Sequence, residues 1–234
     1  MSETARLGLP LLAGAQAQKH VTVNEALARL DALGHLRIAS RMLTSPPPAV
    51  EGIVYAVPGG AGGDWTGEDG RLAIALNGGW VFVTPGDGWR AWIADEGTDA
   101  IFAGGDWIAG GVAVTGSGAG CLLRSVETDH VLTAGTTFVT VPLIPDGSVV
   151  FGVTGRVLAE VTGSASFRIG VPGADDRYGS GIGTSAGSWL RGVTGQPLAY
   201  YADTALVITA EGGSFAGGMV RLAVHFAVLT LPEG

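Results

Sequence analysis

The chain has 234 residues, of which 47% are hydrophobic, only 15% are charged and 40 are glycines. Such an apolar composition excludes a disordered chain, and the length predicts one large or two small compact domains rich in turns. The net charge of −8 disfavours nucleic acid and anionic lipid as partners, because binding to their phosphates draws on lysine and arginine.

Residues 1–48 are predicted to form an extended leader and one amphipathic helix, with Asn24 as the N-cap. The apolar segment from Leu7 to Ala17 follows an acidic residue, so no signal peptide is expected. No run of the chain reaches the ~18 apolar residues of a membrane span. The helix either docks on another protein or a sister chain, or covers the edge of a sheet in its own chain. Its predicted apolar stripe consists of Ala26, Leu27, Leu30, Leu33 and Ile38.

Residues 49–111 are predicted to form a small β domain rich in tryptophan and glycine. Asn77-Gly78 predicts a two-residue hairpin turn, since both residues tolerate the positive φ of a type I′ turn. Alternation in a later strand places Arg90 and Trp92 on the face opposite to the core. An exposed indole beside a guanidinium suits hydroxylated or acidic sugars. The alternative interpretation is that the tryptophans of this segment are core aromatics.

Residues 112–234 are predicted to form an antiparallel β-sandwich of the jelly-roll kind, beginning with a glycine-rich linker or strand. Several apolar segments are separated by turns, and no helical pattern lies between them. In the last segment, Val220 and Leu222 face one way and Arg221 faces the other. The predicted fold class of the chain is therefore mainly β, with helix confined to the N-terminal part.

Polar and aromatic residues gather in predicted loops of this sandwich. Carboxylates accept hydrogen bonds from sugar hydroxyls, an arginine fork matches a uronate, and aromatic rings stack on pyranoses. Loops that converge would form a shallow carbohydrate site; the alternative is a solvated turn, an edge tyrosine pair and a core tryptophan. The candidate carbohydrate-binding residues are Asp175, Asp176, Arg177, Tyr178, Trp189, Tyr200 and Tyr201, together with Trp92 and Arg90.

The sequence contains no recognisable motif for catalysis or metal binding. The four histidines lack ligand spacing, Cys121 stands alone, and there is no nucleophile elbow or phosphate-binding loop. No catalytic residue, metal site or cofactor is predicted, and the chain is not expected to be an enzyme. Carboxylate pairs such as Asp175 and Asp176 leave a glycosidase as an alternative, because that chemistry uses two carboxyl groups across a cleft.

Several segments are distinctive, among them LGLPLLAGAQAQKHVTVNEALARLDAL, TSPP, EGIVYAV, NGGWVFVTPGDGWRAWIADEG and the terminal GGSFAGGMVRLAVHFAV. In these segments the chain resembles an uncharacterised domain family encoded in tail and head-decoration gene clusters of bacterial prophages and gene transfer agents. The resemblance runs from about Leu7 to about Trp107 and is looser in the C-terminal sandwich. It implies a virion surface protein, similar to the head spike or fibre of a gene transfer agent that touches the capsular polysaccharide of the recipient cell.

We therefore expect a structural protein that is made in the bacterial cytoplasm and assembled on the exterior of a virion-like particle. Its β body would bind host polysaccharide, and a homo-oligomer is expected because repeated weak sites gain avidity. A polysaccharide depolymerase and a structural connector without glycan binding are the alternatives. The sequence does not determine which glycan is bound, whether the oligomer is a trimer or a pentamer, whether the protein belongs to the head or the tail, or which domain binds sugar. The candidate residues for attachment to other particle proteins are Gln16, Gln18, Lys19, His20 and Asn24.

Overall fold

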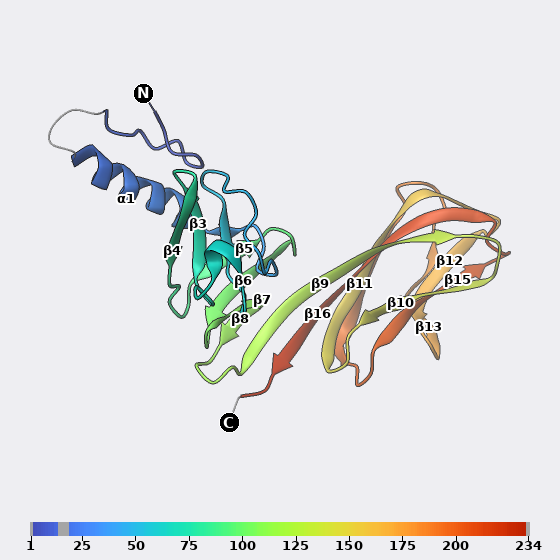
Figure 1. Cartoon of the computed structure of the whole chain (residues 1–234). Helices are drawn as coiled ribbons and strands as arrows, with labels where there is room; N and C mark the ends of the chain where they lie inside the picture. The colour runs from blue at the N-terminus through green and yellow to red at the C-terminus, as the bar shows by residue number, and fades with distance from the viewer. Residues whose placement is uncertain (1, 14–18, 233–234) are drawn as a thin grey trace. The chain divides into compact units, whose positions relative to one another are not determined.

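The computed structural model describes residues 2–13 and 19–232. The protein is mainly β, with several antiparallel strand pairs and helix near its N-terminus, which confirms the predicted fold class. Contacts divide the chain into two compact units, one extending to Gly118 and the other from Ala119 to Leu231. Figure 1 shows the course of the chain through both units and labels many of their helices and strands.

Helix α1 of the first unit spans Lys19–Leu33. It begins before Asn24, so the prediction of Asn24 as the N-cap is wrong. The Asn24 carboxamide instead accepts a hydrogen bond from the Leu12 amide (2.9 Å) and donates one to the Leu12 carbonyl (3.1 Å). The predicted apolar stripe is right only in part: Leu33 packs against the core, and Ile38 is buried but lies beyond the helix. Leu30 is 62% exposed, whereas Ala32, which is not in the predicted stripe, is fully buried. The side chains of α1 that reach the core therefore lie toward its C-terminal end.

The first unit contains a seven-stranded sheet in the order β4-β3-β2-β1-β5-β6-β7. Strand β1 pairs in parallel with β2 and β5, and the other neighbours are antiparallel. Because β1 lies inside this sheet, the segment after the helix shares a core with the tryptophan-rich segment. The bounds in this unit are β1 Arg37–Ile38, β2 Val54–Ala56, β3 Leu72–Leu76, β4 Gly79–Val83, β5 Arg90–Ile93, β6 Thr98–Ala103, β7 Asp106–Ala109 and β8 Gly111–Val114, with a 3-10 helix at Gly63–Trp65.

Both faces of this sheet are covered, since every residue of β3 is buried. One face packs with helix α1, and the other packs Trp80 and Phe82 around the fully buried Trp65. Strands β3 and β4 are joined by Asn77 and Gly78, whose φ angles of 53° and 75° confirm the predicted hairpin turn with two positive φ angles. In β4, Trp80 and Phe82 pack on one face of the sheet and Val81 and Val83 on the other, as the alternation of a strand requires.

The second unit consists of eight strands in two sheets. One sheet has the order β14-β11-β16-β9, and the other has the order β10-β15-β12-β13. Counted from the first strand of this unit, the orders are 6-3-8-1 and 2-7-4-5, which is the arrangement of a jelly roll and confirms the predicted sandwich. The bounds are β9 Gly120–Leu132, β10 Thr137–Ile144, β11 Ser148–Thr162, β12 Ser166–Val171, β13 Ala174–Ile182, β14 Trp189–Ala199, β15 Thr204–Glu211 and β16 Gly217–Thr230.

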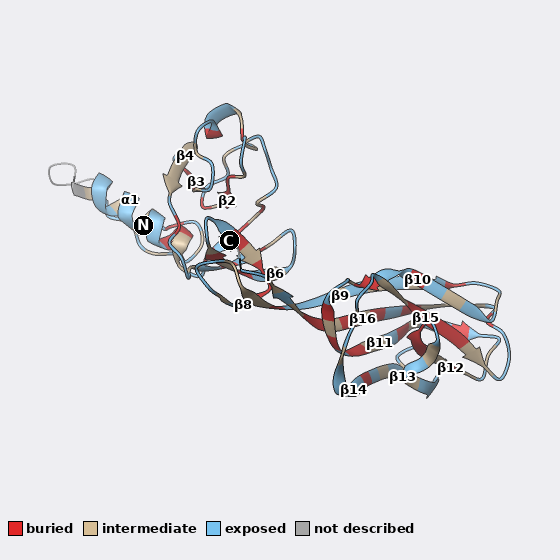
Figure 2. Cartoon of the chain, turned by 90° about the horizontal axis from the view of Figure 1, so that it is seen from below, coloured by how far each residue is buried: buried red, intermediate tan, exposed pale blue. Residues whose placement is uncertain are grey.

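The core of the jelly roll lies between its two sheets, and its strands carry alternating buried and exposed positions (Figure 2). In β16, Val220, Leu222 and Val224 are buried while Arg221 is exposed, which confirms the predicted alternation. Phe167 belongs to the same core, in the opposite sheet. The outer faces of the sheets are therefore where charged side chains such as that of Arg221 are exposed to solvent.

Candidate functional site

Asp175, Asp176, Arg177 and Tyr178 were predicted to lie in a loop, but they belong to strand β13, which begins at Ala174. Asp175 accepts hydrogen bonds from Nε (2.9 Å) and Nη2 (2.8 Å) of Arg168 on the neighbouring strand β12. This pairing lowers the pKa of Asp175. Asp176 and Arg177 are on the same strand, and Arg177 is exposed. The Asp175 carboxylate is thus already engaged within the protein.

Tyr178 and Tyr200 point into the jelly roll rather than toward a ligand. Tyr178 is only 3% exposed, and its hydroxyl lies 2.8 Å from the Tyr200 hydroxyl. Burial, together with the hydrogen bond to Tyr200, raises the pKa of Tyr178. Tyr201, the next residue along the chain, is 86% exposed. The structure therefore pairs Tyr178 with Tyr200 in the interior, leaves Tyr201 at the surface, and does not join the three tyrosines in one exposed site.

The other predicted aromatic candidate, Trp92, lies on β5 of the first unit and is 42% exposed. Arg90 is exposed on the same strand, two residues away, and its Nη2 donates to the Val112 carbonyl (3.0 Å). Ala91 and Ile93 between and beyond them are buried. Trp92 and Arg90 thus share the outward face of β5, on a different unit from the remaining candidates.

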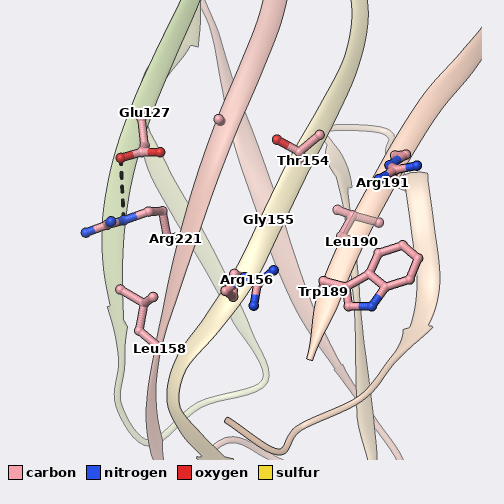
Figure 3. A pocket seen from close by; sticks show the side chains of 10 residues that line it. Glu127, Thr154, Gly155, Arg156, Leu158, Trp189, Leu190, Arg191 and Arg221 are labelled. Carbon is pink, nitrogen blue, oxygen red and sulfur yellow. Dashed lines mark ion pairs between the residues drawn. The ribbon is translucent and has the colours of Figure 1, made fainter. Parts of the chain in front are cut away.

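Trp189 has the most informative position of the predicted residues. It is 63% exposed at the start of β14 and borders a shallow pocket of about 400 Å³ on the outer face of the β14-β11-β16-β9 sheet (Figure 3). A ligand in this pocket would lie on a platform whose opposite face is the jelly-roll core. The lining residues are Glu127, Thr154, Gly155, Arg156, Leu158, Trp189, Leu190, Arg191, Arg221 and Ala223.

Strand register explains why these residues meet. Arg156 of β11 lies directly opposite Trp189 of β14 on one side and Arg221 of β16 on the other. Arg221 in turn lies opposite Asp129 of β9, so four side chains form one row across the sheet. Residues two positions along each strand share the same face. A second parallel row therefore contains Arg191, Thr154, Ala223 and Glu127.

The arginines of the pocket differ in their partners. Arg221 donates from Nε (2.6 Å) and Nη2 (2.7 Å) to the Asp129 carboxylate, and its Nε is 3.5 Å from Glu127. The hydrogen bonds from Arg221 lower the pKa of Asp129. Since two carboxylates surround it, Arg221 is neutralised on the β9 side of the pocket.

Arg156 and Arg191 are exposed and carry no hydrogen bond or ion pair to any described residue. The Arg191 guanidinium carbon lies 5.8 Å from the centroid of the Trp189 ring, within the range of a cation–π contact. Figure 3 shows Trp189 and Arg191 together on one strand, with Arg156 on the next. The β14 side of the pocket thus combines an indole with two guanidinium groups that are available to a ligand.

A histidine lies beside the pocket. Hydrogen bonds join His225 Nδ1 to the Ser125 hydroxyl (2.8 Å) and His225 Nε2 to the Thr154 hydroxyl (2.9 Å). In a nucleophilic triad the second ring nitrogen is oriented by a carboxylate, whereas here it is bonded to a threonine. The arrangement holds the three side chains on the outer face and fixes Thr154 at the edge of the pocket.

Sequence reasoning identified Trp189 but not its cross-strand neighbour Arg156, nor Arg221 on the strand beyond. The alternation of β16 already placed Arg221 on an outer face. The missing information was the register, because Arg156 and Trp189 are distant in sequence and become neighbours only through strand pairing. Without the register, an outward arginine cannot be assigned to a particular aromatic residue.

Of the candidate attachment residues, Gln16 and Gln18 lie outside the described residues. Lys19 and His20 lie in the first turn of α1, and Asn24 holds the main chain of Leu12. The segment of residues 2–13 is therefore tied to the helix by hydrogen bonds as well as by the chain itself.

Asp31 is the main anchor of this segment. It is 2% exposed and accepts hydrogen bonds from the Thr4 hydroxyl (2.8 Å), the Arg6 amide (2.8 Å) and the Leu7 amide (2.5 Å). The Arg6 guanidinium also donates to the Ala32 carbonyl (2.6 Å) near the end of the helix. Burial alone raises the pKa of Asp31, but the hydrogen bonds from Leu7, Thr4 and Arg6 outweigh it, so the pKa is lowered.

We expect Asp31→Asn to lower the free energy of local opening of residues 2–13 by about 2 kcal/mol, because a buried acceptor of three hydrogen bonds loses its charge. Hydrogen exchange of the Arg6 and Leu7 amides at pH 7 measures the change, with the exposed Glu25→Gln as the matched control. Because the pKa of Asp31 is lower in the folded protein than its unfolded value of about 3.9, the charged carboxylate stabilises the folded state above that pH. This stabilisation is lost as the pH falls through the folded-state pKa. The wild-type segment should therefore loosen below about pH 4; unchanged protection in Asp31→Asn would contradict the anchoring role.

Among the described residues there is no group of three or more histidine, cysteine, aspartate or glutamate side chains able to hold a metal ion. The helix in residues 19–33 is too short to cross a bilayer, and no other described helix qualifies.

Comparison with known protein families gives a match to part of the chain. Residues 23–108 match the family described as a protein of unknown function (DUF2793). No curated protein matches the chain. A solved structure of the cyanophage Pam1 capsid asymmetric unit is similar at 24% identity and a TM-score of 0.38, over 50% of this chain and 92% of that one. Bacillus endospore appendages, described as a novel family of disulfide-linked pili, are similar at 14% identity and a TM-score of 0.24, over 50% of this chain and 97% of that one.

Proposed function

We propose that this chain is a structural surface protein of a phage-like particle, of the kind represented by the head spike or fibre of a gene transfer agent, and that it binds host capsular polysaccharide. The observation that supports glycan binding is Trp189, an exposed indole that borders a pocket on a rigid sheet. The sequence resemblance supports the particle, and it falls largely on the segment that matches DUF2793.

The pocket suits a sugar chain better than a small apolar ligand. It is shallow, it lies on the outer face of a sheet, and it is lined by charged side chains around one indole. A pyranose ring stacks its C–H groups on an aromatic face, and its hydroxyls pair with neighbouring polar groups. Thr154, on the strand next to that of Trp189, and Glu127, on the far side of the pocket, provide such groups. An extended polymer can continue past the pocket in either direction, since the surface is open.

The first unit is assigned to attachment in this proposal. Residues 2–13 are held on α1 by Asp31 and Asn24, so the helix and leader form one surface that can contact a capsid protein or spike base. Several copies on one particle would bind a polysaccharide with high avidity even where each pocket binds weakly. A homo-oligomer is part of this proposal.

We expect Trp189→Ala to weaken binding to capsular polysaccharide by about fivefold, since an aromatic contact contributes roughly 1 kcal/mol and each 1.4 kcal/mol is tenfold. Binding of the purified chain to encapsulated cells, with capsule-free cells as the control, measures the effect. Trp92→Ala separates the two exposed tryptophans. Loss of binding in Trp92→Ala instead of Trp189→Ala would move the site to the first unit.

The same assay distinguishes the alternative functions. If the polysaccharide shortens over hours in the presence of the chain, the protein is a depolymerase and not only a binding protein. Equal retention on encapsulated and capsule-free cells, or none on either, would leave a structural connector. Capsule-dependent binding at constant polymer length is the result that the proposal expects.

A further inference from the structure

We propose that the pocket beside Trp189 selects anionic polysaccharides, and that it binds the carboxylate or sulfate of a sugar residue between Arg156 and Arg191. This inference rests on the proposed function and adds the class of polysaccharide to it. Its basis is a pair of guanidinium groups that have no hydrogen-bond or ion-pair partner among the described residues and lie beside an exposed indole, which Arg191 contacts through a cation–π interaction.

The chemistry of arginine supports an oxyanion ligand. A guanidinium is always charged and presents its donors in a planar fork that matches carboxylate and sulfate oxygens. Elsewhere on this chain, arginines already use that fork internally: Arg168 binds Asp175, and Arg221 binds Asp129. Arg156 and Arg191 keep the same donors free at the surface. An external oxyanion provides what the internal carboxylates provide to the other two arginines.

Register places both free guanidinium groups within reach of one sugar residue. Arg156 lies directly opposite Trp189 on the neighbouring strand, and Arg191 lies two positions from Trp189 on its own strand. Neighbouring strands are about 4.8 Å apart, and residues two positions apart in a strand are about 7 Å apart. A pyranose stacked on the indole therefore has its ring substituents beside both arginines.

The opposite side of the pocket limits where the anion can lie. Asp129 and Glu127 surround Arg221 there and repel a second anion. A carboxylated sugar would consequently be oriented with its charged group toward β14 and β11 and its hydroxyls toward Glu127 and Thr154. The pocket thus has a positive side and a negative side, and a neutral sugar would gain no charge pairing from this arrangement.

The local charge differs from that of the whole chain, whose net charge is −8. Long-range electrostatics therefore do not concentrate polyanions near this protein, and a nucleic acid with closely spaced phosphates is disfavoured. A polysaccharide with one oxyanion per sugar, separated by neutral stacking surface, fits an isolated pair of free arginines. This is the reason for choosing an acidic polysaccharide over a nucleic acid.

The test uses the full chain and four polymers of similar length: polygalacturonate, the same polymer with its carboxylates reduced to alcohols, dextran sulfate and neutral dextran. Binding is measured by biolayer interferometry for the wild type and for Arg156→Gln/Arg191→Gln. We expect the wild type to bind at least one anionic polymer, and the double variant to lose about tenfold or more in affinity. The variant Arg29→Gln/Arg37→Gln removes the same charge from exposed arginines of the first unit and should bind as the wild type does.

The outcomes separate this inference from the function on which it rests. Preference for polygalacturonate over its reduced form identifies a carboxylate ligand, and preference for dextran sulfate identifies a sulfate; both support the inference. Equal binding of anionic and neutral polymers overturns the inference but keeps the polysaccharide-binding function. No binding to these polymers or to capsule overturns both. Single-stranded DNA is tested as a further polyanion, and arginine-dependent binding of DNA without polysaccharide binding overturns both as well. Circular dichroism confirms that each variant is folded.

Discussion

Gly192→Ala should destabilise the jelly roll by about 3 kcal/mol or more, because the added methyl group has no room. A Cβ at Gly192 would lie 2.0 Å from the Tyr178 carbonyl oxygen and 2.8 Å from its carbonyl carbon. These are backbone atoms of β13, which belongs to the other sheet, so no side chain can rotate away to make space. The two sheets would have to separate where β13 and β14 meet.

Thermal unfolding followed by circular dichroism measures this effect, and a fall of roughly 10 °C in Tm is expected for a unit of this size. Gly195→Ala is the matched control, because Gly195 lies on the same strand and a methyl group added there would have no atom within 4 Å. It should unfold as the wild type does. Equal Tm values for the two variants would show that β13 and β14 are not held in contact in solution.

Gly192→Ala should also weaken polysaccharide binding, since Gly192 directly follows Arg191 on β14. A displaced strand would move Trp189 and Arg191 away from Arg156, on which the proposed site depends. Binding measured well below the Tm separates this displacement from global unfolding.

Trp65→Ala should cost the first unit about 3–5 kcal/mol of unfolding free energy, the range for removing a large aromatic side chain from a core. Trp65 is fully buried, and its ring centroid lies 5.6 Å from that of Tyr55 and 5.3 Å from that of Trp80. The substitution removes these ring contacts and leaves a cavity beside the sheet. Because a typical domain is stable by only about 5–15 kcal/mol, much of the stability of this unit is lost.

Urea unfolding followed by circular dichroism gives the change for Trp65→Ala. Trp92→Ala provides the comparison, because Trp92 is 42% exposed and its loss should cost less than about 1 kcal/mol. Similar costs for both variants would mean that Trp65 does not pack in the core as described. The pair also tests two interpretations of the tryptophans, as core side chains or as exposed binding groups.

Local patterns predicted the strands and their faces well. Asn77-Gly78 identified a hairpin, since few residue pairs tolerate two positive φ angles. Alternation in β16 assigned Arg221 to the outside and Val220 to the inside, because side chains of a strand point alternately to its two faces. Both signals depend only on residues a few positions apart.

Other predictions failed where a tertiary contact replaced a local preference. Asn24 has a side chain suited to an N-cap, but it lies within α1 and holds the main chain of Leu12. Polar residues from Asp175 to Arg177 suggested a loop, yet they belong to β13, an edge strand whose partly exposed positions tolerate polar side chains. The pairing of Asp175 with Arg168 further satisfies the charge there.

The sequence by itself determined the mainly β class, the jelly-roll character of the C-terminal part and the presence of aromatic and arginine side chains on outward faces. Only the tertiary structure decided which of them meet, because the rows across a sheet are set by register between strands distant in sequence. Trp189 is the centre of a candidate site because strand pairing places it beside Arg156, whereas Tyr178 is no longer a candidate binding residue because it is buried. Local chemistry selects the side chains that can bind, and strand pairing selects the ones that bind together.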